Sequence, residues 1–375
     1  MNNRYRKARI VLLYERAHHL AKPITWVERR YDDSNFWGCG LVRVGGVGSG
    51  LHSSDTLAVH GANGPAPVEG FRPRMEYLLT IVRALITGAS GFAGRALTAH
   101  LRDVGDDVIP WSRANGDPDI TDRPSVVAAL SESDAAVVYH LAAQSNVPRA
   151  WEDPETTHAI NVGGTQNILD GAIANGAMRV IVVTSSAVYG AVPPEELPVV
   201  ETSALRPRNP YAASKVAADE AAVTAHEQGL DVIRLRAFNH FGPGQSTIFA
   251  SSGFAHRIAL ASRSGTTTIE VGSLDARRDF TDVRDVVRAY RCAATDGESG
   301  EVYNVCSGTD RSMREIAEGL VNRSGSNISF RVSPELKRPV ETPVVRGSAE
   351  RLFEQTGWQP EIPLNRASTT STKMR

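Results

Sequence analysis

The sequence lacks the features that define several classes of protein. Its three cysteines, Cys39, Cys292 and Cys306, lie far apart without a CxxC pair, which argues against a disulfide framework or a metal site. No run approaches the roughly 18 consecutive apolar residues that cross a bilayer, and the amino end does not have the order of a signal peptide. The 41 basic and 42 acidic side chains nearly cancel, so no net field gathers nucleic acid or anionic lipid. We therefore expect a cytoplasmic protein without a nucleic-acid or membrane partner.

The first 76 residues differ in pattern from the rest of the chain. They combine Arg-rich segments, a glycine-rich stretch from Gly38 to Gly50 and a turn-forming run from Gly61 to Pro67, and no periodicity persists. We expect residues 1–76 to be a disordered extension, or to lie outside the natural product if translation starts at Met75. A flexible tail of unknown role is the alternative.

From Thr80 onward, short β-branched runs alternate with Ala-rich amphipathic segments, which is typical of a parallel sheet wound with helices. The predicted strands are residues 80–86, 107–111, 135–141, 179–184 and 231–235, and the predicted helices are residues 93–101, 125–130, 156–174 and 212–226. These βα steps favour an α/β fold with a doubly wound parallel sheet over a barrel. The irregular pattern after Phe238 predicts a smaller lobe that closes over a substrate.

A glycine turn connects the first predicted strand to the first helix. Gly88 permits a tight turn, Gly91 lets the backbone approach a pyrophosphate, and Gly94 lets the helix pack closely on the sheet. A turn without a ligand is the alternative. We predict a Rossmann-type site for NAD or NADP, with Ser90 and Phe92 among its contacts.

The second predicted strand does not end in the acid that usually accepts a hydrogen bond from the ribose of NAD. Trp111 is followed by Ser112 and Arg113, which could satisfy a 2′-phosphate, so NADPH is the favoured cofactor. A solvated Arg113, with either cofactor accepted, is the alternative. Asp119 and Ile120 lie where the Asp119 carboxylate could accept from the adenine amino group.

Tyr211 and Lys215 lie four residues apart at the start of a predicted helix, on one face of it. Ser185 ends a predicted strand whose carboxyl end faces the cofactor crevice. A free phenol is a poor acid at neutral pH, but a nearby ammonium stabilises the phenolate. We predict that Tyr211 exchanges the proton, that Ser185 orients a carbonyl oxygen, and that Lys215 tunes Tyr211 and binds the nicotinamide ribose.

Together with residues 140–143 and 161–165, these motifs resemble the extended short-chain dehydrogenase/reductase family from Ile81 to about Leu364. That family includes nucleotide-sugar epimerases, dehydratases and reductases. Segments 238–245, 274–285, 301–308 and 338–341 look like its GDP-mannose branch, and most like the GDP-4-keto-6-deoxy-mannose reductases within it. The resemblance implies a Rossmann NAD(P)-binding domain over residues 77–236 and 275–307, and a nucleotide-sugar lobe over residues 237–274 and 308–368.

The same resemblance implies binding residues and a homodimer. Leu141 and Ala142 would contact the cofactor. The residues implied for the GDP-sugar substrate are Ser186, Asn239, Arg278, Arg338 and Glu341. The arginines would offset the charge of a diphosphate, because their forked donors suit phosphate oxygens. An exposed surface pair is the alternative for Arg338 and Glu341.

The resemblance implies reduction of the C4 ketone of a GDP-4-keto-6-deoxy-hexose, with formation of GDP-6-deoxy-mannose, also called GDP-rhamnose. A GDP-mannose 4,6-dehydratase and a nucleotide-sugar 4-epimerase are the alternatives, and a non-catalytic dinucleotide sensor is the outlier. The dehydratases carry a carboxylate two residues after the strand-end Ser or Thr, where this chain has Ala187. The sensor is the weakest hypothesis because Tyr211 and Lys215 are both present.

We expect a chain shortened to begin at Met75 to keep its melting temperature and turnover, because nothing before Met75 carries a periodic apolar face or a recognisable site. Thermal unfolding and steady-state rates of both forms check this. Unfolding or inactivation of the shortened chain would make the extension an integral part of the structure.

Overall fold

The computed structural model describes residues 81–176, 178–336 and 342–363, together with four short strands nearer the amino end. Residues 1–80 and 81–375 are two separate units. In the first unit the strands pair antiparallel in the order β3-β2-β1-β4, and they are β1 (Lys7–Tyr14), β2 (Val27–Arg30), β3 (Arg43–Val44) and β4 (Leu57–His60). The hypothesis that residues 1–76 are a disordered or dispensable extension stays a prediction.

The second unit is built on a six-stranded parallel sheet in the order β13-β9-β8-β7-β5-β6. Its strands are β5 (Arg83–Thr87), β6 (Asp107–Trp111), β7 (Val137–His140), β8 (Arg179–Ser185), β9 (Val232–Ala237) and β13 (Val302–Val305). The five predicted strands are all present. Because β6 and β7 flank β5 on opposite sides, the chain reverses its winding between β5 and β7, and in such sheets a ligand crevice opens at that point.

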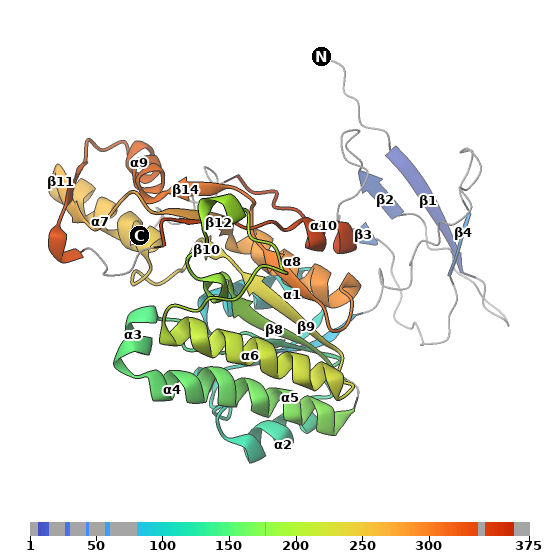
Figure 1. Ribbon diagram of the computed structural model, residues 1–375. Coiled ribbons are helices and arrows are strands. Elements are labelled where there is room, and N and C mark those ends of the chain that lie inside the picture. Colours follow the sequence, from blue (N-terminus) through green and yellow to red (C-terminus); the bar gives the residue numbers. More distant parts are fainter. Residues whose placement is uncertain are drawn as a thin grey trace. The chain divides into compact units, whose positions relative to one another are not determined.

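Helices cover both faces of this sheet (Figure 1). One face carries α1 (Phe92–Asp103) and α8 (Val283–Asp296), and the other carries α2 (Arg123–Ser133), α5 (Gly164–Asn175) and α6 (Pro210–Glu227). The two faces share β5, where Ala84 and Ile86 belong to one buried cluster and Leu85 to the other. This strand is buried on both faces, as central strands of parallel sheets are. The doubly wound α/β fold is thus confirmed.

The long helix predicted over residues 156–174 is present, and it contains a π turn. The short helix α3 (Val147–Glu152) precedes it, and α4 (Pro154–His158), the π-helical turn η3 (Ala159–Gly163) and α5 then follow one another without a gap. The π turn adds a residue to the helical ladder, and such turns often occur at functional sites. Sequence periodicity alone does not reveal this insertion.

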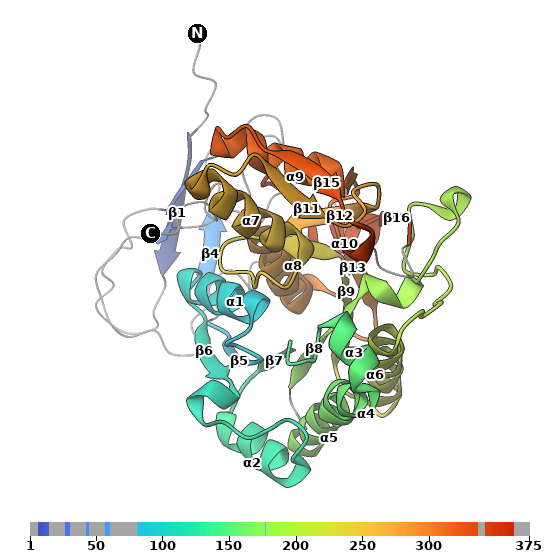
Figure 2. The same ribbon diagram turned by 90° about the vertical axis from the view of Figure 1, so that its left-hand side faces the viewer.

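The smaller lobe has its own sheets and helices (Figure 2). Strands pair in the order β10-β12-β14, β16 pairs with β12, and β11 pairs with β15. The elements are β10 (Asn239–Phe241), α7 (Ala250–Ser264), β11 (Thr268–Val271), β12 (Arg277–Asp282), β14 (Asp310–Ser312), α9 (Met313–Ser324), β15 (Ser329–Val332), η6 (Pro334–Leu336) and β16 (Val344–Val345). Helix α10 (Glu350–Thr356) contacts α8 and β13 of the large lobe. The resemblance implies that residues 275–307 belong to the Rossmann domain. Of these, residues 277–282 form β12, which pairs within the small sheet and not within the large one.

None of the helices in the described ranges is long and apolar enough to cross a membrane.

A buried carboxylate holds α6 to the large sheet. Asp219 forms ion pairs with Arg236 at 2.9 Å and with Arg234 at 3.0 Å, both on the neighbouring strand β9. The side chains of Asp219 and Arg236 are only 3% and 5% exposed. Asp219 lies one turn after Lys215 on the same helix, so this ion-pair cluster fixes how the helix lies on the sheet.

We expect Asp219→Asn to lower the free energy of unfolding by about 3–5 kcal/mol, because it leaves buried arginine charge without a compensating carboxylate. Asp170→Asn is the matched control: its partner Arg123 has a 63% exposed side chain, so the loss should be at most about 1 kcal/mol. Urea unfolding measures both. Equal small losses would show that the Asp219 cluster does not anchor the helix.

Candidate active site

The glycine turn is packed so closely that two of its positions have no room for a side chain. Gly88 has φ of +72°, and a Cβ there would lie 2.8 Å from the backbone nitrogen of Ala142. A Cβ on Gly94 would lie 2.2 Å from the carbonyl oxygen of Gly88. The turn is therefore pressed against the end of β7, beside Leu141. Gly91 stays exposed at the start of α1, so the backbone N–H groups there form a cradle that fits a pyrophosphate.

The residues after β6 lie next to this turn. Ser112 is buried, and its hydroxyl donates to the hydroxyl of Ser90 at 2.6 Å. Arg113 begins the short helix η2 (Arg113–Asn115) and forms an ion pair with Asp119 at 2.9 Å. The two side chains for which we predicted contacts with the 2′-phosphate and with adenine thus contact each other in the structure, and their contacts with the cofactor stay a prediction. Hydrogen bonds from Thr121 lower the pKa of Asp119, and Arg113 adds to that effect.

Ile120 faces away from these polar groups. Its side chain is buried and packs against Gly164 at the start of α5, and its carbonyl oxygen accepts from Asn167 at 2.9 Å. Any contact of Ile120 with adenine stays a prediction.

The three predicted catalytic side chains come together at the end of β8. Helix α6 begins at Pro210, with the Asn209 side chain accepting from a backbone N–H as the N-cap, which places Tyr211 in the first turn. Burial raises the pKa of Tyr211, and a hydrogen bond with the Ser185 side chain opposes that rise. Lys215 donates to the carbonyl oxygen of Val183 at 3.0 Å. Burial lowers the pKa of Lys215 to about 8.

A buried histidine behind these residues was assigned no role from the sequence. His140, at the end of β7, lies between the hydroxyl of Thr87 at 2.8 Å and that of Thr165 at 3.0 Å. Thr165 donates its own proton to the carbonyl oxygen of Asn161, so it must accept from Nε2–H of His140. Burial, and next the charge of Lys215, lower the pKa of His140 to about 3. His140 is therefore a neutral imidazole of fixed tautomer beside Lys215.

The π turn places Asn161 against α6, the helix that carries Tyr211 and Lys215. Its amide nitrogen donates to the Ser214 hydroxyl at 2.9 Å, and Ser214 donates to the carbonyl oxygen of Tyr211 at 2.8 Å. Asn161 also exchanges two hydrogen bonds with the backbone of Gln144. The quoted segments 140–143 and 161–165 were the only signal for this network, and spacing alone did not connect them to α6.

The predicted substrate residues are spread over both lobes. Ser186 is buried at the start of η4 (Ser186–Tyr189), directly after Ser185, and Asn239 is exposed on β10. Next to Asn239, the His240 ring stacks on Phe92 at 5.9 Å and its Nδ1 donates to a backbone carbonyl, so it packs the small lobe against the glycine turn. Arg338 and Glu341 lie outside the described residues.

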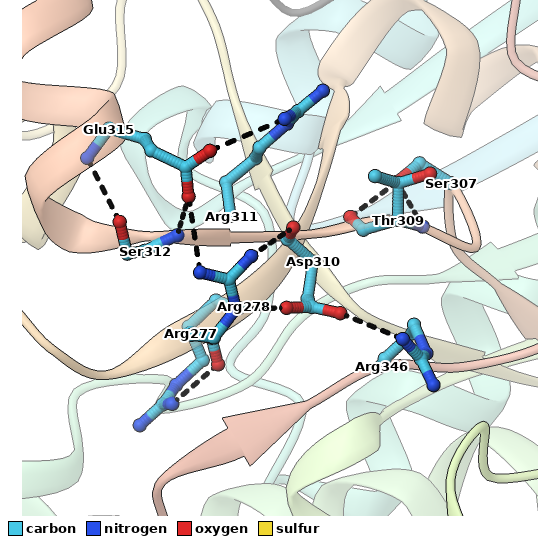
Figure 3. A network of polar contacts seen from close by, with 9 residues as sticks. All are labelled: Arg277, Arg278, Ser307, Thr309, Asp310, Arg311, Ser312, Glu315 and Arg346. Atoms are coloured by element: carbon cyan, nitrogen blue, oxygen red, sulfur yellow. Dashed lines mark hydrogen bonds and ion pairs between the residues drawn. The ribbon is translucent and has the colours of Figure 1, made fainter.

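Adjacent arginines on β12 turn to different partners (Figure 3). Arg277 forms ion pairs with Asp310 and with Glu315, whereas Arg278 donates to the carbonyl oxygen of Arg277 at 2.8 Å. Arg346 forms a second ion pair with Asp310, at 3.2 Å. Successive strand residues point to opposite faces, so Asp310 lies on the face opposite Arg278.

The next residue of β12 connects the small sheet to the large one. Asp279 is fully buried, and its carboxylate accepts from the backbone and hydroxyl of Ser307 and from the backbone of Gly308 at 2.6–2.9 Å. Ser307 and Gly308 lie in the loop after β13, the edge strand of the large sheet, and follow its last residue by two and three positions. Burial raises the pKa of Asp279, and these hydrogen bonds oppose the rise. Both sheets therefore fix the position of Arg278.

Residues 84–306 match the family described as the NAD dependent epimerase/dehydratase family. The chain belongs to this family. Its members in the comparisons include enzymes named as reductases, epimerases and dehydratases. The resemblance to extended short-chain dehydrogenases/reductases is thereby confirmed.

The regions aligned with individual relatives cover almost the whole length of those proteins. The GDP-6-deoxy-D-mannose reductase of Pseudomonas aeruginosa is 38% identical over 290 residues, which are 76% of this chain and 94% of that protein. A solved structure described as RMD from Pseudomonas aeruginosa complexed with NADPH matches with a TM-score of 0.69 and 36% identity, over 76% of this chain and 96% of that chain. The UDP-glucose 4-epimerase of Thermus thermophilus, solved with NAD, matches with a TM-score of 0.68 and 28% identity, over 77% and 97% of the two chains.

We expect the rate of carbonyl reduction to fall as the pH rises through about 8. The pKa of Lys215 lies near that value, so its ammonium is present below pH 8 and lost above it, and Tyr211 then becomes a weaker acid. Steady-state rates between pH 6 and 10 test this. The residual activity of Lys215→Arg, which stays charged, should lack the fall near pH 8. A wild-type profile that is level to pH 10 would contradict the assignment.

Proposed function

We propose that this enzyme reduces the C4 ketone of a GDP-4-keto-6-deoxy-hexose with a nicotinamide cofactor and forms GDP-6-deoxy-mannose, also called GDP-rhamnose. One observation carries the choice of reaction: at the end of β8 the Tyr211 hydroxyl forms a hydrogen bond with the Ser185 side chain and Lys215 donates to the carbonyl oxygen of Val183, while the position that elimination requires holds Ala187. The 38% identity to a GDP-6-deoxy-D-mannose reductase supports the same choice.

In the proposed reaction each of the three side chains acts at one atom. Ser185 donates to the carbonyl oxygen of the substrate and orients it. Tyr211 gives its phenolic proton to that oxygen as charge develops there, and the ammonium of Lys215 stabilises the phenolate that remains. A reduced nicotinamide, when bound, supplies the hydride that the carbonyl carbon accepts. The neutral His140 behind Lys215 adds no competing positive charge.

The cofactor is proposed to be NADPH or NADH, with NADPH favoured. The residues proposed to hold it are Gly88, Ser90, Gly91, Phe92, Gly94, Arg113, Asp119, Ile120, Leu141, Ala142 and Lys215. For the GDP-sugar we propose Ser186, Asn239 and Arg278, with Arg338 and Glu341 as further candidates. A homodimer in the cytoplasm completes the proposal.

The test incubates the full chain separately with GDP-mannose alone and with the keto sugar plus NADPH, following cofactor absorbance and product mass. We expect a gain of two mass units from the keto sugar and no reaction of GDP-mannose, because reduction adds two hydrogen atoms. Loss of water from GDP-mannose would overturn the proposal in favour of the dehydratase. Interconversion of a C4 epimer pair without net cofactor use would overturn it in favour of the epimerase.

We expect Tyr211→Phe to lower kcat by at least roughly 10²-fold with little change in cofactor affinity, because it removes the proton donor and keeps the ring. Tyr290→Phe is the matched control, since the Tyr290 hydroxyl is buried and has no hydrogen-bond partner among the described residues. Single-turnover rates and calorimetric cofactor titrations measure both effects. A Tyr211→Phe enzyme with a wild-type rate would exclude this phenol as the acid.

A further inference from the structure

Strand β6 does not end in an acidic residue, but the loop that follows it brings the carboxylate of Asp117 back to the strand end. Gly116 has φ of +87°, a left-handed conformation that glycine adopts without strain, and it reverses the chain after η2. The reversal returns Asp117 to Ser112, whose backbone N–H donates to Oδ2 of Asp117 at 2.7 Å. A negative charge therefore lies at the end of β6.

This strand end lies directly against the glycine turn. The backbone nitrogen of Ala89 donates to the carbonyl oxygen of Trp111 at 3.2 Å, and the Ser112 hydroxyl donates to that of Ser90 at 2.6 Å. In dinucleotide-binding folds the end of the second strand faces the ribose of the adenosine. Two hydrogen bonds, from Ser112 N–H to Asp117 and from the Ser112 hydroxyl to Ser90, thus connect the Asp117 carboxylate to the glycine turn.

The charged groups of this loop are not equivalent. Arg113 offsets the charge of Asp119, whose other oxygen accepts from the backbone and hydroxyl of Thr121. Asp117 accepts from a neutral N–H and forms no ion pair within the part of the chain that the structure describes. One arginine and two aspartates give this loop a net charge of −1.

We propose that Asp117 sets the discrimination at the ribose 2′ position, by placing a negative charge where the 2′-phosphate of NADP would lie. A 2′-hydroxyl can donate to this carboxylate, whereas a phosphate is repelled by it. Arg113, with a 74% exposed side chain, attracts the same phosphate. The two effects oppose each other, so the enzyme accepts NADH as well as NADPH. This inference rests on the proposed function only for the class of cofactor.

The experiment measures binding of adenosine 2′,5′-bisphosphate and of AMP to the full chain by isothermal titration calorimetry. These ligands differ only in the 2′-phosphate. We expect Asp117→Asn to tighten binding of the bisphosphate by roughly five- to tenfold, as removal of one charge a few ångströms away would, and to change AMP binding less than about twofold. Asparagine keeps a carbonyl oxygen that can accept from Ser112, so the loop should keep its shape.

Three variants control for charge and for fold. Asp117→Glu keeps the charge and should keep the wild-type ratio of the two dissociation constants. Asp107→Asn removes an exposed carboxylate at the opposite end of β6, beside Arg83, and should leave the ratio unchanged. Asp117→Ser is a second neutral variant in case Asp117→Asn does not fold, and melting temperatures establish which variants are folded.

An unchanged ratio in the folded neutral variants overturns the inference, as does an equal effect on both ligands, which would mean that Asp117 only shapes the loop. If neither ligand binds the wild-type protein, the adenosine site itself is wrong. Because neither ligand contains a nicotinamide or a keto sugar, these results do not depend on the reductase assignment, and a failed reductase assay does not affect them.

Discussion

The buried ion pair between Asp219 and Arg236 is the constraint on which the catalytic geometry depends. Tyr211 and Lys215 lie on α6, and Ser185 lies on β8, so the site exists only if the helix and the sheet keep a fixed relation. Asp219 binds both, because it accepts from two arginines of β9 and from the hydroxyl of Thr184 at 3.3 Å, one residue before Ser185. A buried charge with several geometric partners tolerates little displacement, since any shift leaves an arginine without its counter-charge.

Networks of hydrogen bonds between uncharged groups adjoin the proposed catalytic residues. His140 is satisfied at both nitrogens by threonine hydroxyls, and Asn161 connects the π turn to Ser214 on α6. Thr165 donates to the backbone carbonyl of Asn161, so it accepts from His140, and His140 in turn accepts from Thr87. Each hydrogen bond of this chain therefore has a fixed donor and a fixed acceptor. A neutral, fully bonded interior therefore lies next to Lys215, and the ammonium of Lys215 is the only positive charge among these groups.

The loops proposed to bind the cofactor and the substrate are each held by carboxylates to which the proposal gives no part in hydride transfer. After β6, Asp117 accepts from the backbone N–H of Ser112, and Asp119 pairs with Arg113. Asp279 holds β12 to the loop after β13. Asp279 and Asp117 differ in how deeply their carboxylates are buried. Asp279 is surrounded by neutral donors deep in the protein and acts as a structural link, whereas Asp117 is half-buried in the loop after β6, where we propose that its charge acts on a ligand.

The sequence by itself determined the parts of this protein that depend on local pattern. Apolar runs predicted five of the six strands of the large sheet and missed β13, the spacing of Gly88, Gly91 and Gly94 predicted the turn, and the four-residue spacing of Tyr211 and Lys215 placed both on one helical face. The helix expected over residues 156–174 is present, but its π turn was not predicted, because one inserted residue hardly alters an apolar pattern. Only the tertiary structure decided the strand order, the meeting of Ser185 with Tyr211, the bonding of His140 and the return of Asp117 to Ser112. Those contacts depend on strand pairing and on a left-handed turn at Gly116, and many sequences with the same local periodicity would satisfy neither.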